Sequence, residues 1–170
     1  MARVFLISNL KSRTSYSTAL YLAALSIISV SAYILTSHFY FQIGFPLDDS
    51  WIHQTYARNL AVSGEWAFLP GEISGGSTSP LWTAILSVGY LLKISPFIWA
   101  FGMGVLVLWG VAFFVEDTIS RLIVSYHPVF PWIGLLLIFE WHFTWAAASG
   151  METLLFSAPC IVRKGVGVGN

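Results

Sequence analysis

The chain has little charge, a single cysteine and no excess of either charge sign. Only 9% of its 170 residues are charged, against roughly a quarter in soluble domains, while 56% are hydrophobic. Eight basic residues balance eight acidic ones, which excludes the positive field needed to bind nucleic acid. Cys160 alone can form neither an internal disulfide nor a multi-cysteine metal site. The composition therefore predicts a protein that resides in the lipid bilayer.

The longest uncharged stretch is predicted to be a transmembrane helix. No acidic or basic side chain lies between Arg13 and Asp48, and residues 19–40 exceed the roughly 20 residues that span a hydrocarbon core. A cleaved signal peptide is the alternative, but its apolar region would reach only about 7 to 15 residues and end in small residues. Aromatic residues follow here instead, so we interpret residues 19–40 as the first span.

Two further spans are predicted in the second half of the chain. Residues 97–115 are long enough to cross a bilayer, and residues 122–139 are marginally long enough. Between them Glu116, Asp117 and Arg121 are expected to form a short polar turn. The expected fold is therefore an all-α membrane protein.

Residues 80–92 decide between two topologies. This apolar stretch has only about 13 residues before Lys93, which is short for a span and typical of an interfacial helix. If it lies on the surface, the protein has about three transmembrane helices plus outer-face interfacial helices. If it crosses, there are four. We favour three, because a half-length segment closed by Lys93 and Pro96 would have to thin the bilayer.

The basic residues orient the chain and divide it into parts. Three of them precede the first span and acidic residues predominate after it, so a multi-pass protein of the cell membrane with a cytoplasmic N-terminus is predicted. Residues 1–158 would form one transmembrane portion, with outer loops at 42–96 and about 140–152. Residues 159–170 interrupt a further apolar stretch with proline, basic residues and glycine. We interpret this tail as the result of truncation or a change of frame.

Two adjacent carboxylates, Asp48 and Asp49, follow the first span and are the strongest candidates for chemistry. Two like charges at a membrane interface are costly without a partner, so they invite a cation or a proton. One could act as general base on an acceptor hydroxyl while its neighbour holds a divalent cation or orients the first. Helix capping explains them equally well, because aspartate at a helix start accepts backbone N–H bonds.

His53 and Arg58 are candidates for binding a phosphate. His53 follows Asp49 by four positions, so on a helix the imidazole could contact that carboxylate or help bind a phosphate oxygen. A solvated histidine with no role is the simpler interpretation. Arg58 is the only cation of this outer segment before residue 93, and its planar fork of donors suits a lipid phosphate. A salt bridge to Glu65 or Asp49 is the alternative.

Glu152 is the acidic candidate at the other end of the chain. It follows a run of small residues, and in the three-span topology it would stand over the same outer cavity as Asp48. The alternative is a glutamate in the first turn of a helix, where it stabilises the positive end of the helix dipole.

Five short motifs occur in one order along the chain. They are Asp48–Ile52 (DDSWI), Tyr56–Leu60 (YARNL), Pro70–Glu72 (PGE), Thr78–Trp82 (TSPLW) and Ser149–Thr153 (SGMET). Together they resemble the N-terminal region of GT-C superfamily membrane glycosyltransferases, specifically the bacterial arabinofuranosyltransferase-like and related proteins. The resemblance covers about residues 48–156.

The resemblance implies a function and a set of roles. It implies inverting transfer of a sugar from a polyprenyl-phosphate donor to an extracytoplasmic glycan, lipid or protein acceptor. It makes Asp48 and Asp49 the acidic pair, one of them the general base, and places Glu152 in the same cavity. Tyr56 and Arg58 belong to the motif that would approach the donor phosphate.

This chain departs from the family in two respects. Family members are several times longer, so the chain is expected to be a fragment that is inactive as an enzyme by itself. His53 stands where a small or aromatic residue is expected, so it takes no role from the family. A non-catalytic or degenerate membrane protein that keeps only the scaffold is the alternative function.

Overall fold

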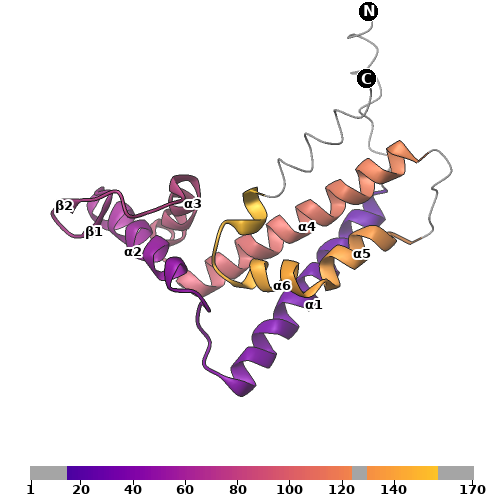
Figure 1. Ribbon diagram of the computed structural model, residues 1–170, viewed down its shortest axis with the longest axis horizontal. Helices are drawn as coiled ribbons and strands as arrows, with labels where there is room; N and C mark the ends of the chain where they lie inside the picture. The colour runs from indigo at the N-terminus through magenta and orange to yellow at the C-terminus, as the bar shows by residue number, and fades with distance from the viewer. Residues whose placement is uncertain (1–14, 124–129, 157–170) are drawn as a thin grey trace, which may run out of the picture.

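The structure, a computed structural model, describes residues 15–123 and 130–156 (Figure 1). Six helices make up most of this part: α1 (Tyr16–Tyr40), α2 (Asp48–Ser63), α3 (Pro80–Leu91), α4 (Pro96–Leu122), α5 (Trp132–Phe139) and α6 (Trp141–Ala148). A two-stranded antiparallel hairpin, β1 (Ala67–Leu69) and β2 (Glu72–Ile73), follows α2. The prediction of an all-α fold is confirmed apart from this hairpin, whereas the predicted atypical tail lies outside the described residues.

Two helices, α1 and α4, are long and apolar enough to cross a membrane by length and composition. The Ser15 hydroxyl starts α1 by accepting the Thr18 amide, and 25 residues follow without a break. Only 22% of the most apolar window of α1, and 28% of that of α4, is buried inside the described chain. Both helices therefore leave most of their apolar surface uncovered by the rest of the described protein.

The predicted polar turn between the second and third spans is wrong. Glu116, Asp117 and Arg121 lie in the last turns of α4, which runs on to Leu122. Arg121 binds Asp117 four residues earlier, with its terminal nitrogen 2.7 Å from Oδ2, a spacing that supports continued helix. The Glu116 carboxylate is buried and accepts the Ile133 and Gly134 amides, so it caps the start of α5.

The predicted third span, residues 122–139, is not one helix in the described structure. Its described part contains α4 to Leu122 and the eight-residue α5, and residues 124–129 lie outside the described part. Glu140 then leaves the helical conformation, and its carboxylate accepts the Phe143 amide to start α6. The stretch assigned to a second outer loop thus contains a helix whose residues Ala146–Ala148 are buried.

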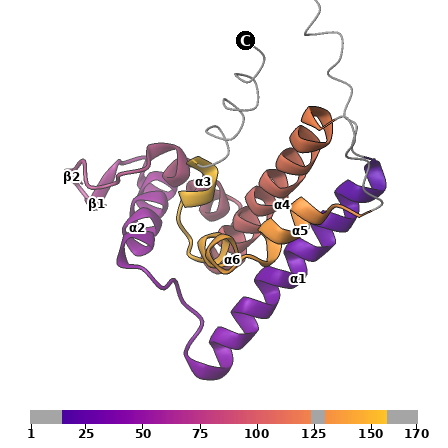
Figure 2. The same cartoon turned by 45° about the vertical axis from the view of Figure 1, so that its right-hand side comes forward.

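The helices form two groups, which lie side by side along α4 (Figures 1 and 2). In the first group α1, α4, α5 and α6 pack around Leu22, Leu108 and Ile138. In the second, α2 and α3 pack against each other, and Trp82 and Leu86 bury their side chains together with part of α4. The short helix predicted at residues 80–92 is confirmed as α3, whereas a membrane-surface position of α3 stays a prediction.

Candidate functional site

The acidic pair lies in the first turn of α2, and both carboxylates are exposed. The preceding residue, Leu47, has extended backbone and offers no capping side chain, so α2 begins directly with Asp48 and Asp49. Within residues 15–123 and 130–156, neither carboxylate takes part in a hydrogen bond or a salt bridge. Their negative charges therefore stabilise the helix only through its dipole, and their oxygens are available to a ligand.

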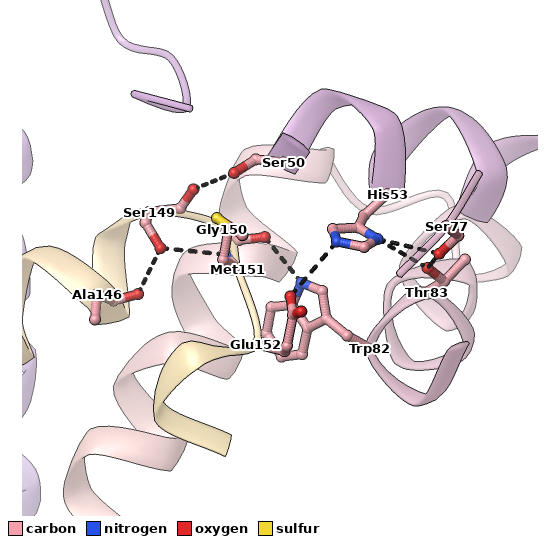
Figure 3. Close-up of polar contacts among 10 residues, drawn as sticks. All are labelled: Ser50, His53, Ser77, Trp82, Thr83, Ala146, Ser149, Gly150, Met151 and Glu152. Atoms are coloured by element: carbon pink, nitrogen blue, oxygen red, sulfur yellow. Dashed lines mark hydrogen bonds and ion pairs between the residues drawn. The ribbon is translucent and has the colours of Figure 1, made fainter. Parts of the chain in front are cut away.

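His53 is buried, and the expectation of a solvated histidine is wrong. Its side chain is 1% exposed. Its Nδ1 atom lies 3.2 Å from the Ser77 hydroxyl and 3.3 Å from the Thr83 hydroxyl, while its Nε2 atom lies 3.5 Å from Glu152 Oε2 (Figure 3). The predicted contact with Asp49 is also absent from the described contacts, because α3 and the segment around Glu152 cover His53 but leave the Asp49 side chain exposed.

The turn formed by residues 149–152 docks onto α2 and α3 through backbone carbonyls. The Ser50 hydroxyl donates to the Ser149 carbonyl at 2.7 Å, and the Trp82 indole N–H donates to the Gly150 carbonyl at 2.8 Å (Figure 3). Gly150 has a positive φ of 75° and packs against the Phe45 ring, so a side chain there would be strained and would collide. The glycine of the SGMET motif is therefore required by this close approach.

This docking brings Glu152 to the end of α2 that carries the acidic pair. Ser50 and Ser149 are 99 positions apart in sequence, yet they are joined directly. Glu152 is 13% exposed and contacts His53; no direct contact joins it to Asp48 or Asp49 among the described residues. The structure thus places the three predicted acids on adjoining segments and pairs Glu152 with histidine.

The order hydroxyl, imidazole, carboxylate resembles the catalytic triad of hydrolases, but it cannot work as one here. Ser77 is 8% exposed and Thr83 is fully buried, so neither hydroxyl is open to a substrate. The two hydroxyls also bond to each other at 2.8 Å. A nucleophile must be accessible to its substrate, so these residues serve a structural role.

Tyr56 and Asn59 fix the segment after α2, which corrects the expectation that Tyr56 binds substrate. The Tyr56 side chain is almost fully buried, and its hydroxyl bonds to the Ser74 hydroxyl at 2.6 Å and accepts the Gly76 amide at 2.8 Å. The Asn59 amide donates to two carbonyls of β1. A phenol enclosed by these partners has no free surface for a ligand, because the loop after the hairpin folds over it.

Arg58 is exposed on α2 and stays available to an anion. The alternative salt bridges to Glu65 and Asp49 are not formed, and the Glu65 carboxylate instead accepts the Gly71 amide at 2.9 Å. Burial raises the pKa of Tyr90, and the positive charge of Arg58 offsets part of that rise. The guanidinium of Arg58 therefore lies close enough to α3 to act electrostatically on it.

Four residues of the junction were not singled out from the sequence: Ser50, Ser77, Trp82 and Thr83. Ser50 and Trp82 belong to the DDSWI and TSPLW motifs, which is the one signal that could have found them. No group of three or more histidine, cysteine, aspartate or glutamate side chains in the described part of the chain could hold a metal ion. The described residues thus contain no such cluster that could hold the expected divalent cation.

The fold and the site define a helical chain with two helices able to cross a membrane and a polar junction of α2, α3 and residues 149–152. Compared with known proteins, the chain matches no family model, no curated protein and no solved structure. Its function is therefore inferred from its own residues.

Proposed function

We propose that this chain is the N-terminal part of a GT-C-type membrane glycosyltransferase, which transfers a sugar from a polyprenyl-phosphate donor to an extracytoplasmic acceptor. In this proposal α1 and α4 cross the cell membrane, the N-terminus is cytoplasmic and α2 stands outside. The length of the two helices and their uncovered apolar surfaces support the membrane position.

One observation carries the proposal: an exposed acidic pair stands free at the start of α2, directly after a long apolar helix. Asp48 and Asp49 are exposed and accept no hydrogen bond within the described residues, so both carboxylates are open to a ligand. The docking of residues 149–152 brings Glu152 to the same end of α2, where it contacts His53. Three carboxylates at one end of a membrane domain suit proton removal from a hydroxyl acceptor.

The chemistry assigns one aspartate as general base. It takes the proton of the acceptor hydroxyl while the hydroxyl oxygen bonds to the sugar's anomeric carbon from the face opposite the phosphate. The bond between that carbon and the phosphate oxygen breaks, and the polyprenyl phosphate leaves with the bonding electrons. Inversion at the sugar follows from this single displacement.

Charge stabilisation of the leaving phosphate is assigned to Arg58. Its guanidinium is exposed, carries no salt bridge among the described residues and can bind phosphate through two parallel N–H bonds. Mg²⁺ is commonly held by one or two carboxylates together with substrate phosphates, so the aspartate of the pair that is not the base would suffice to hold one beside the donor. It would supply further positive charge at the phosphate.

The test uses membranes that contain the full-length parent protein of which this chain is proposed to be the N-terminal part, incubated with radiolabelled pentose and hexose donors on decaprenyl phosphate. We expect transfer of label to a glycan or lipid acceptor in membranes with the unchanged parent protein. The Asp48→Asn/Asp49→Asn variant should lose at least about a hundredfold in rate, the usual scale of general base catalysis. Unchanged transfer by that variant would refute the assignment of the base.

A specific observation supports a second candidate, a non-catalytic membrane scaffold. Ser50, His53, Tyr56 and Asn59 of the motif region all serve internal contacts. A scaffold needs these contacts and leaves the acids without a role. Binding of decaprenyl phosphate to the chain in nanodiscs distinguishes the two: binding that weakens in Arg58→Gln supports the transferase, and absence of binding supports the scaffold.

A further inference from the structure

His53 and Glu152 face each other with polar atoms that nothing else satisfies. Within the described residues, His53 Nε2 and Glu152 Oε2 are both buried, and neither atom forms a hydrogen bond. They lie 3.5 Å apart, with the imidazole on α2 and the carboxylate on the docked turn (Figure 3). Each atom is too buried to find water, so each is the only partner available to the other.

The hydroxyls on the other side of the ring favour a proton on His53 Nε2. The Ser77 and Thr83 hydroxyls bond to each other, which uses one of their two protons. The remaining proton can be donated to His53 Nδ1, which lies 3.2 Å and 3.3 Å from the two oxygens. Nδ1 is then an acceptor, and the neutral ring carries its proton on Nε2, pointing at Glu152.

We infer that His53 is a positioning residue for Glu152: its Nε2–H holds one oxygen of the carboxylate and thereby fixes the side chain over the outer end of α2. The catalytic importance of this position rests on the proposed function. The other links between the turn and the α2–α3 pair, from Ser50 and Trp82, end on backbone carbonyls. His53 therefore supplies the side-chain contact that orients the carboxylate itself.

Loss of this contact should loosen the turn. Burying a carboxylate oxygen without a donor costs free energy, so the turn should open toward water more often. The chain offers a matched control in His142 and Glu140, which bond at 2.6 Å on the surface, where the imidazole is 84% exposed. An exposed pair contributes little, so its loss should leave the turn closed.

The experiment measures opening of the turn by thiol labelling. The full chain carries Cys160→Ser and Met151→Cys, is purified in detergent and is reacted with a maleimide. We expect Glu152→Met and His53→Phe each to raise the labelling rate about tenfold or more, because each change leaves a buried polar atom without its close polar partner. The double variant should label no faster than the faster single variant, and His142→Gln should not change the rate.

A second measurement needs no destabilising variant. Nitrogen NMR of the chain labelled with ¹⁵N-histidine should show His53 protonated at Nε2, and Glu152→Gln should shift that signal. A proton on Nδ1, or a labelling rate that Glu152→Met leaves unchanged, would overturn the inference. Neither readout depends on sugar transfer, so failure of the His53 inference and failure of the Asp48 and Asp49 assignment are separable.

Discussion

Substitution of Gly104 by alanine should destabilise the contact between α4 and α6. Gly104 is buried in α4, and a Cβ built on it would lie 2.8 Å from the carbonyl carbon of Ala147 and closer still to its oxygen. Those atoms are backbone, so α6 itself would have to move. Overpacking costs about 1–3 kcal/mol, whereas alanine in place of glycine gains about 1 kcal/mol of helix propensity.

The overpacking cost should lie at the upper end of this range because the overlapping atom is backbone, so we expect the free energy of unfolding to fall by about 2 kcal/mol. That corresponds to a Tm lower by about 4–8 °C for a chain of this size, measured by thermal unfolding in detergent. Gly110 is the control: it lies in the same helix with open space around it, so alanine there should raise Tm. Equal Tm values for the two variants would refute the packing of Gly104 on α6.

Three further predictions concern single contacts within the fold. Trp82→Phe removes the donor to the Gly150 carbonyl, so the free energy of unfolding in denaturant should fall by about 1–3 kcal/mol. Glu116→Gln replaces the carboxylate that caps α5, and hydrogen exchange of the first α5 amides should become faster. The hydrogen bond from His142 lowers the pKa of Glu140 below 4.5; its stabilisation is therefore present above the unfolded-state value and lost as pH falls through the lowered pKa. Carbon NMR should show that pKa rising in His142→Gln; an unchanged value would contradict the contact.

Helix content and helix starts were largely predictable from the sequence. The long uncharged stretch predicts α1, and the interpretation of Asp48 and Asp49 as residues of a helix start agrees with the start of α2. The errors fell where local patterns were ambiguous. The charges of Glu116 and Asp117 suggest an exposed polar turn. In the structure both residues lie in α4, where Glu116 caps the start of α5 and Asp117 pairs with Arg121.

The candidate site could be predicted only in part. Asp48 and Arg58 are exposed as their chemistry suggests, because nothing in the described fold covers these two side chains. His53 and Tyr56 could not be assigned, since an imidazole or a phenol suits water and a packed interior equally well. Their burial follows from α3 and the loop after the hairpin, which local sequence does not specify.

The sequence by itself determined which segments are helical and apolar, because hydrophobic length and capping residues act over a few neighbouring positions. Only the tertiary structure decided that residues 149–152 reach back to α2. That meeting depends on Gly150 fitting against Phe45, on the Trp82 indole finding a carbonyl, and on His53 facing Glu152 across 3.5 Å. Contacts between residues about 70 to 100 positions apart are set by how whole helices pack, and no local pattern encodes that packing.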